Sequence, residues 1–173
     1  MDDLSPLTPS SQTPSAATLH RAPVAEVDPR TLYLLAKLRQ DVFSIEQGAT
    51  DPDLDGRDLE AGTTLLWIEV PGPEAEAAGL AGEPAAHIRV LTEPDGSMRI
   101  GRLAVRAQNR RDGFGGRIMR AALDLTREIA PDQVVRIDAQ AYLEDWYRAM
   151  GYVTVGGMFL EAGIEHVPME YRH

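Results

Sequence analysis

The sequence contains no cysteine in its 173 residues. This absence excludes disulfides, cysteine nucleophiles and cysteine-based zinc sites, and it agrees with a reducing compartment. No apolar run approaches the roughly 18 residues that a membrane-spanning helix needs, so no membrane partner is expected. We therefore predict a cytoplasmic protein.

Lysine is nearly absent as well, since Lys37 is the sole one. The chain accordingly lacks the Gly-Lys-Ser or Gly-Lys-Thr ending of a P-loop. Acidic residues outnumber basic ones, giving a formal net charge of −10. Nucleic-acid binders are more often basic overall, so this balance argues against a nucleic-acid partner.

The length suits one domain with a sizeable core. Residues 1–22 are rich in Ser, Thr and Pro and have few large apolar side chains. They cannot bury enough surface to order themselves, so we predict a disordered tail at 1–22 and a domain at 23–173. Residues 71–84 carry several Pro and Gly residues and are expected to form an extended turn between two strands.

Hydrophobic periodicity within the domain alternates between helical and strand spacing. Asp28 followed by Pro29 predicts the start of the first helix. Gly101, inside the third expected strand, predicts a bulge or a close backbone approach. The order is typical of a mixed α/β fold. The expected elements are a helix at 29–45, a loop at 48–62, strands at 63–70, 85–91 and 97–105, a helix at 113–129, a strand at 133–139, a short helix at 142–150 and strands at 152–155 and 166–171.

Residues 110–120 combine a basic doublet, a Gly-x-Gly-Gly turn and a helix start. Glycines there let backbone N–H groups approach a ligand, and the helix N-terminus favours an anion. The turn lies in a basic island on an acidic chain, which indicates a small phosphate ligand; the alternative is a set of solvated helix arginines. The island consists of Arg99, Arg102, Arg106, Arg110, Arg111, Arg117 and Arg120.

Three motifs resemble the GNAT superfamily of N-acetyltransferases. Arg110, Gly113 and Gly115 match its (Arg or Gln)-x-x-Gly-x-Gly pyrophosphate loop. Residues 140–152 are similar to its Asn-x-x-Ala-x-x-Leu-Tyr-x-x-x-Gly-Phe segment, with Gln140 in the Asn place and Leu143 in the Ala place. Residues 38–47, 53–58 and 159–169 look like the ElaA branch. The resemblance covers roughly residues 30 to 171.

The resemblance implies a mixed central sheet flanked by helices, with a splayed strand that forms an acyl-CoA cleft. It implies direct transfer of an acetyl group from acetyl-CoA to a primary amine in a ternary complex. The pantetheine would lie along the third strand, where one N–H could polarise the thioester carbonyl, and the pyrophosphate would lie on the glycine turn. The cofactor-binding residues implied are Leu103, Ala104, Val105, Arg110, Arg111, Asp112, Gly113, Phe114, Gly115, Gly116 and Gln140.

By the same resemblance Tyr147 is the acid that protonates the leaving thiolate. A phenol has a pKa of about 10 and a thiol a pKa of about 8.5, so a positioned tyrosine can donate its proton to the thiolate. The alternative is a core tyrosine beside Trp146. The family's glutamate on the third strand has no counterpart between Arg99 and Val105. Glu46 is the first choice of base, and the further candidates are Asp55, Asp58, Glu161 and His166.

The acidic loop after residue 48 imitates a calcium loop, but Pro52 and Gly62 break the pattern. The four histidines are scattered, so no metal is expected. We expect Asp55 and Asp58 to recruit a cationic acceptor near Glu161 and His166; the alternative is that both aspartates cap turns.

Other functions stay open on the sequence. The missing third-strand glutamate favours a GNAT fold that binds acyl-CoA as a sensor without turnover, whereas Tyr147 favours an enzyme. Transfer of a larger acyl group and a ligand-free scaffold are weaker alternatives. The resemblance also raises a homodimer formed through the last strands.

Overall fold

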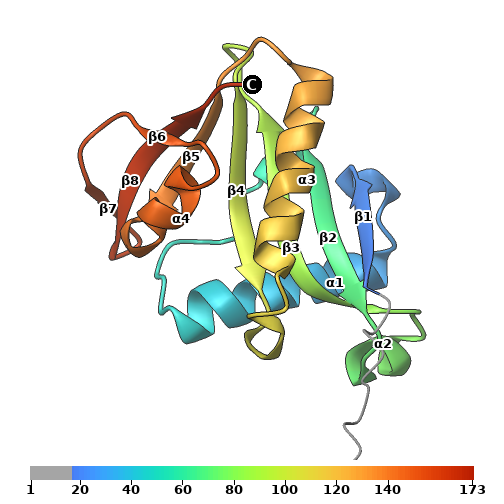
Figure 1. Cartoon of the computed structure of the whole chain (residues 1–173). Helices are drawn as coiled ribbons and strands as arrows, with labels where there is room; N and C mark the ends of the chain where they lie inside the picture. The colour runs from blue at the N-terminus through green and yellow to red at the C-terminus, as the bar shows by residue number, and fades with distance from the viewer. Residues whose placement is uncertain (1–16) are drawn as a thin grey trace, which may run out of the picture.

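The computed structural model describes residues 17–173 as an eight-stranded sheet with helices on both faces (Figure 1). This mixed α/β architecture is the one expected. The strands are β1 (Thr18–Ala22), β2 (Thr64–Val70), β3 (Glu83–Thr92), β4 (Met98–Val105), β5 (Val135–Gln140), β6 (Val153–Thr154), β7 (Phe159–Glu161) and β8 (Ile164–Tyr171). The α-helices are α1 (Pro29–Arg39), α2 (Pro73–Ala78), α3 (Phe114–Ile129) and α4 (Glu144–Arg148). Shorter helical segments are η1 (Val24–Glu26), η2 (Gln40–Glu46), η3 (Arg57–Leu59), η4 (Ala107–Asn109) and η5 (Ala141–Leu143).

The sheet divides between β4 and β5. Its order is β1-β2-β3-β4-β5-β8-β6, with β7 also on β8, and only β4 and β5 run parallel. These two strands pair only through Met98 with Val135 and Arg99 with Arg136. Beyond that point they diverge (Figure 1), so the expected splayed strand is confirmed and the side of β4 toward β5 is free of strand pairing.

A β-bulge lies in β4 beside Gly101, as the sequence predicts. Arg89 of β3 pairs with Gly101, and His87 pairs with Ala104. The extra residue is accommodated at Arg102, whose φ of 56° is unusual for a residue with a side chain. A bulge twists and bends its strand, and here it bends β4 where the split from β5 opens.

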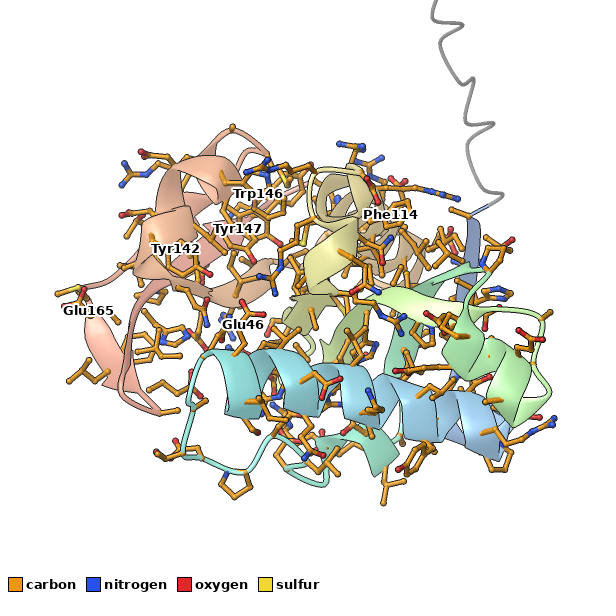
Figure 2. All side chains as sticks on the ribbon, turned by 90° about the horizontal axis from the view of Figure 1, so that it is seen from below. Glu46, Phe114, Tyr142, Trp146, Tyr147 and Glu165 are labelled. Atoms are coloured by element: carbon orange, nitrogen blue, oxygen red, sulfur yellow. The ribbon has the colours of Figure 1, made fainter. Side chains whose placement is uncertain are left out.

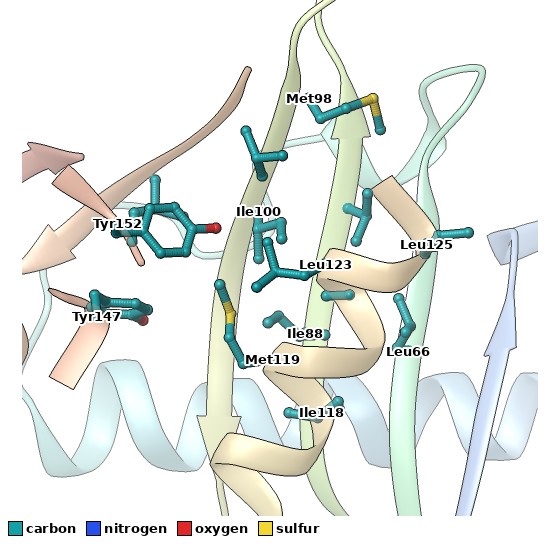
Figure 3. Packing of buried hydrophobic residues seen from close by; sticks show 14 of the residues in the cluster. Leu66, Ile88, Met98, Ile100, Ile118, Met119, Leu123, Leu125, Tyr147 and Tyr152 are labelled. Carbon is teal, nitrogen blue, oxygen red and sulfur yellow. The ribbon is translucent and has the colours of Figure 1, made fainter. Parts of the chain in front are cut away.

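Two helices cover the two faces of the sheet. α3 packs its apolar stripe on one face through side chains such as Ile118, Met119 and Ala122, all fully buried. Figure 3 shows Ile118 and Met119 against β2, β3 and β4. α1 covers the opposite face with Leu35 and Leu38. Because both faces are covered, β3 is buried along nearly its whole length.

Four expectations need correction. Residues 18–22 form β1 and pair with β2, so the ordered fold includes part of the predicted tail; the tail up to residue 16 lies outside the described residues. Residues 71–84 contain α2, which Pro73 starts and Gly79 ends in the left-handed region. The chain ends in three strands and not in the expected two, because residues 159–161 form β7.

The fourth correction concerns the first helix. Asp28 caps it as predicted, accepting a hydrogen bond from the Arg30 amide at 2.8 Å. After Arg39, however, the chain continues as the π-helix η2. In residues 17–173 no helix is both long and apolar enough to span a bilayer.

Candidate active site

A cleft of about 1120 Å³ opens where β4 and β5 part. Its walls come from η2, the acidic loop, β4, the start of α3, the β5–α4 segment and the β7–β8 hairpin. Figure 2 shows Tyr142, Trp146 and Tyr147 on one side of it and Glu46, at the end of η2, on the other. Five of the predicted cofactor-binding residues line the cleft: Leu103, Val105, Arg110, Gly115 and Gln140.

The glycine turn ends at this cleft and starts α3. Gly113 is the N-cap residue at φ 78°, and no side chain caps the helix. The first amides of α3 therefore lack intrahelical partners and can receive an anion. Gly115 lies between Val105 and Trp146, since a side chain there would meet both at 3.7 and 3.9 Å.

The remaining predicted cofactor residues do not line the cleft with their side chains. Ala104 is fully buried and packs with Leu38 and Val42 beneath α1, so any contact with a ligand would be through its backbone. Phe114 packs against the core instead. The others outside the lining are Arg111, Asp112, Gly113 and Gly116.

Arg110 and Glu46, predicted for different tasks, bind each other. The guanidinium donates to both carboxylate oxygens, at 2.6 and 2.7 Å, and its Nε donates to the Val105 carbonyl at 3.2 Å. This hydrogen-bonded pairing lowers the pKa of Glu46. Glu46 is therefore a weaker base while Arg110 holds it.

Tyr147 lies in the cleft wall, only 8% exposed. It meets Trp146 and Tyr152 edge to face, with ring centroids 4.8 and 5.8 Å apart. Burial, with Tyr142 nearby, raises the pKa of Tyr147. Its hydroxyl therefore keeps its proton throughout the neutral range, so it can act there as a proton donor but not, as a phenolate, as a base.

The acidic loop forms an ion cluster with arginines from three elements. We call it the buried ion cluster after its two buried arginines, Arg39 and Arg89, although Asp55 in it is exposed and lines the cleft. Arg39 binds Asp53 at 2.7 Å and Asp58 at 2.8 Å. Arg89 binds Asp55 with both terminal nitrogens, at 2.7 and 2.8 Å. The cluster consists of Arg39, Arg89, Arg102, Asp53, Asp55 and Asp58.

Three carboxylates face three guanidiniums, so the buried ion cluster is neutral. Desolvation opposes ionisation of Asp55 and Asp58, but their arginine partners prevail and lower the pKa of both carboxyls. Asp55 also caps a turn, accepting from the Arg57 amide at 3.0 Å. These contacts favour structural roles for both aspartates over capture of a cationic acceptor, although only Asp55 caps a turn and Asp58 binds two arginines instead.

Glu161 and His166 keep positions on the cleft. Glu161, on β7, is exposed, and it has no ion-pair partner among residues 17–173. His166 is 8% exposed, stacks on Phe159, and its Nδ1 lies 2.8 Å from the Ile164 carbonyl oxygen. That carbonyl can only accept, so Nδ1 carries the proton and Nε2 is the basic nitrogen.

Sequence reasoning missed several residues of the site. Phe43 and Trp146 contribute apolar surface to the cleft. The side-chain oxygen of Gln47 accepts a hydrogen bond from the side-chain amide of Gln140 at 2.9 Å. Arg39 and Arg89 are buried despite their charge. Both lie at core positions of apolar helix and strand patterns. A charge at a core position needs a partner, so this pattern could have predicted buried ion pairs at these two arginines. Residues 17–173 contain no group of three or more His, Asp or Glu side chains placed to hold a metal ion.

His87, buried beside the ion cluster, makes stability depend on pH. Its Nδ1 lies 3.1 Å from the Leu66 carbonyl oxygen, while Nε2 has no hydrogen-bond partner among residues 17–173. Burial, aided by Arg39, lowers the pKa of His87 to about 3. The unfolded chain binds a proton near pH 6.5, so stability is complete above that pH and falls as the pH drops toward 3.

We expect the free energy of unfolding in urea to be about 2 kcal/mol lower at pH 5 than at pH 7. In His87→Gln, which removes the titrating group, this difference should largely disappear. An equal fall with pH in both proteins would show that His87 is not its source.

Comparisons with known proteins agree with this geometry. The family model described as an acetyltransferase (GNAT) domain matches residues 74–173. A UPF0039 protein of Mycobacterium tuberculosis is 42% identical over 154 residues, spanning 87% of this chain and 90% of its own. Protein ElaA of Escherichia coli is 30% identical over 149 residues, spanning 84% of this chain and 90% of its own.

Solved structures show the same architecture. An acyl-CoA N-acyltransferase of Pseudomonas aeruginosa superposes with a TM-score of 0.78 at 28% identity, and Escherichia coli ElaA with a TM-score of 0.78 at 26% identity. In each case the match covers 90% of this chain and 99% of the other. The split sheet, the uncapped glycine turn and these relatives lead to one conclusion: the chain belongs to the GNAT acetyltransferase family, in the branch that includes ElaA.

Proposed function

We propose that this protein transfers an acetyl group from acetyl-CoA directly to a primary amine. Its family supports acyl transfer from acyl-CoA in general; the acetyl group, the amine and the residue roles are the proposal. The observation that carries it is the cleft between β4 and β5, which ends at the uncapped start of α3 and has Tyr147 in its wall.

The cleft offers the two ends of an acyl-CoA different partners. The amides at the start of α3 and the guanidinium of Arg110 would bind the pyrophosphate. The unpaired side of β4, along Leu103 and Val105, would bind the pantetheine by backbone hydrogen bonds. The thioester would then lie between β4 and Tyr147.

The reaction needs one attack and two proton movements. The amine nitrogen attacks the thioester carbonyl, a backbone N–H of β4 stabilises the resulting oxyanion, and the C–S bond then breaks. Tyr147 donates its proton to the leaving thiolate, and a base removes the proton from the amine nitrogen. The products are an N-acetyl amide and free CoA.

For the base, Glu46 and His166 suit the cleft better than the aspartates of the buried ion cluster. Glu46 is held by Arg110 in this structure and would act only after that ion pair opens. His166 already has an imidazole Nε2 that can accept a proton, because its Nδ1 hydrogen is directed at the Ile164 carbonyl. Both are therefore assigned as candidates for the same role.

A cationic acceptor is retained in the proposal because of Glu161, not because of Asp55 and Asp58. Glu161 lines the cleft and is exposed. Asp51, also exposed, lies on the same cleft. Carboxylates in this setting attract an ammonium group without having to leave an arginine partner.

The proposal is tested by measuring thiol release from acetyl-CoA in the presence of a panel of amines, including polyamines, amino sugars and lysine peptides. Amine-dependent release, with the N-acetyl product identified by mass spectrometry, is the expected result. Tight acetyl-CoA binding without release for any amine would instead favour the sensor function. Release with propionyl-CoA but not acetyl-CoA would replace the acetyl part of the proposal.

A further inference from the structure

The end of the π-helix η2 is bonded to both sides of the split in the sheet. Glu46 binds Arg110, which follows β4, and the next residue, Gln47, accepts a hydrogen bond from Gln140, the last residue of β5. We call these two contacts together the η2 bridge. The two strands that diverge beneath it are therefore rejoined by two consecutive residues of a third element.

The backbone of η2 places these two residues together. The Gln47 amide donates to the Val42 carbonyl at 3.1 Å, five residues back, which is the π-helical pattern. π-Helical turns are rare and frequently lie at functional sites. On the other side of Glu46, α1 is fixed to the sheet by Leu35 and Leu38, so the η2 bridge extends from a rigid element.

The η2 bridge occupies Arg110, the side chain to which the proposed function assigns the pyrophosphate. Arg110 has one guanidinium, and both of its terminal nitrogens are used by Glu46. A pyrophosphate bound bidentately by Arg110 would need those same donors. The Glu46 carboxylate and the pyrophosphate are thus competitors for one cation. Both partners of the ion pair are nearly half exposed, 42% and 44%, so an exchange does not require the core to open.

We propose that acyl-CoA binding exchanges partners at Arg110: the pyrophosphate displaces the Glu46 carboxylate, which is released into the cleft. The inference rests on the proposed function, because it needs acyl-CoA in this cleft. Its consequence is an order of events, since the Glu46 carboxylate becomes free to accept a proton only once the acyl donor is bound. This makes Glu46 a competitor of the cofactor's phosphates for Arg110 as well as a candidate base.

The test is calorimetric titration of the full chain with CoA, comparing wild type with Glu46→Gln. The variant no longer has a charged competitor for Arg110, so we expect CoA to bind about two- to fivefold more tightly, the range of an exposed ion pair. Pantetheine, which lacks the phosphates, should bind both proteins equally.

A matched control removes one negative charge elsewhere. Glu128 pairs with Arg21 at 2.7 Å on the surface, and neither residue lines the cleft. Glu128→Gln should leave the Kd for CoA within the error of the titration. If it tightened CoA binding as much as Glu46→Gln does, the effect would be general electrostatics and the exchange would be wrong.

Two further outcomes would overturn the exchange. An unchanged Kd for CoA in Glu46→Gln would show that the pyrophosphate does not compete for Arg110. Weaker binding would show that Glu46 holds Arg110 in place for the phosphate. Failure of wild type to bind CoA at all would instead contradict the proposed function, so the two failures are distinguishable.

Discussion

Tyr147→Phe is expected to lower the kcat of amine-dependent thiol release by about 100- to 10,000-fold, the usual contribution of a general acid. The substitution removes one hydroxyl from a buried side chain that lines the cleft. The ring and its contacts with Trp146 and Tyr152 remain. The Kd for acetyl-CoA should therefore stay within about twofold of wild type while turnover falls.

Tyr152→Phe is the matched control for this experiment. Tyr152 is in the same aromatic cluster, is 2% exposed, and its hydroxyl is buried without a hydrogen-bond partner. Tyr152 does not line the cleft. Removing its hydroxyl should leave kcat near the wild-type value. Equal losses in both variants would mean that the cluster needs hydroxyls for packing, and full activity of Tyr147→Phe would remove Tyr147 from the mechanism.

The part of the cleft proposed to bind the cofactor could be predicted from the sequence because its signals are local. The glycine turn requires a left-handed residue directly before a helix, and Gly113 provides it within a short motif. The bulge near Gly101 is also encoded by one residue type in a strand pattern. Such features depend on neighbours in the chain, so spacing alone indicates them.

The part proposed to bind the acceptor could not be predicted in the same way because long-range ion pairs define it. Asp55 is 34 residues from Arg89, and Glu46 is 64 residues from Arg110. An acidic loop and scattered arginines look the same in sequence whether they meet or not. The loop therefore suggested free carboxylates, whereas the fold neutralises Asp55 and Asp58 with arginines from α1, β3 and β4.

Short edge elements were missed for a different reason. β1 has five residues, only partly buried, and is stabilised by pairing with β2 rather than by its own apolar pattern. β7 has three exposed residues and forms only as the partner of β8. Strand formation at such positions depends on the neighbouring strand, which single-chain periodicity does not reveal.

Asp58→Asn is expected to destabilise the fold by about 2–3 kcal/mol. Asp58 binds Arg39 at 2.8 Å and Arg89 at 3.2 Å, and both guanidiniums are only 4% exposed. Breaking a fully buried pair costs roughly 3–5 kcal/mol. The smaller figure applies here because Asp58 is 15% exposed and each arginine keeps another aspartate. The melting temperature should fall by roughly 5–10 °C.

The pH dependence of this loss separates a charge effect from a packing effect. The arginine partners lower the pKa of Asp58, so its stabilising contribution is complete above the unfolded-state pKa of about 3.9 and is lost as pH falls through the lower folded value. The difference in unfolding free energy between wild type and Asp58→Asn should thus be equal at pH 7 and pH 5 and shrink below about pH 4. Between pH 5 and pH 7 His87 affects both proteins alike, because its folded-state pKa of about 3 lies below this range.

Asp124→Asn removes the same charge from an exposed site, where Asp124 lies 3.9 Å from Arg127 and is 70% exposed. It should change stability by less than about 0.5 kcal/mol. If Asp58→Asn were equally mild, the buried ion cluster would not be needed for folding and its aspartates would again be available to an acceptor. If it were unstable but kept the amine KM of wild type, Asp58 would act only through the fold. The arginine contacts predict this last result. The charge of a carboxylate between two buried guanidiniums is already compensated, so it attracts a substrate ammonium group only weakly.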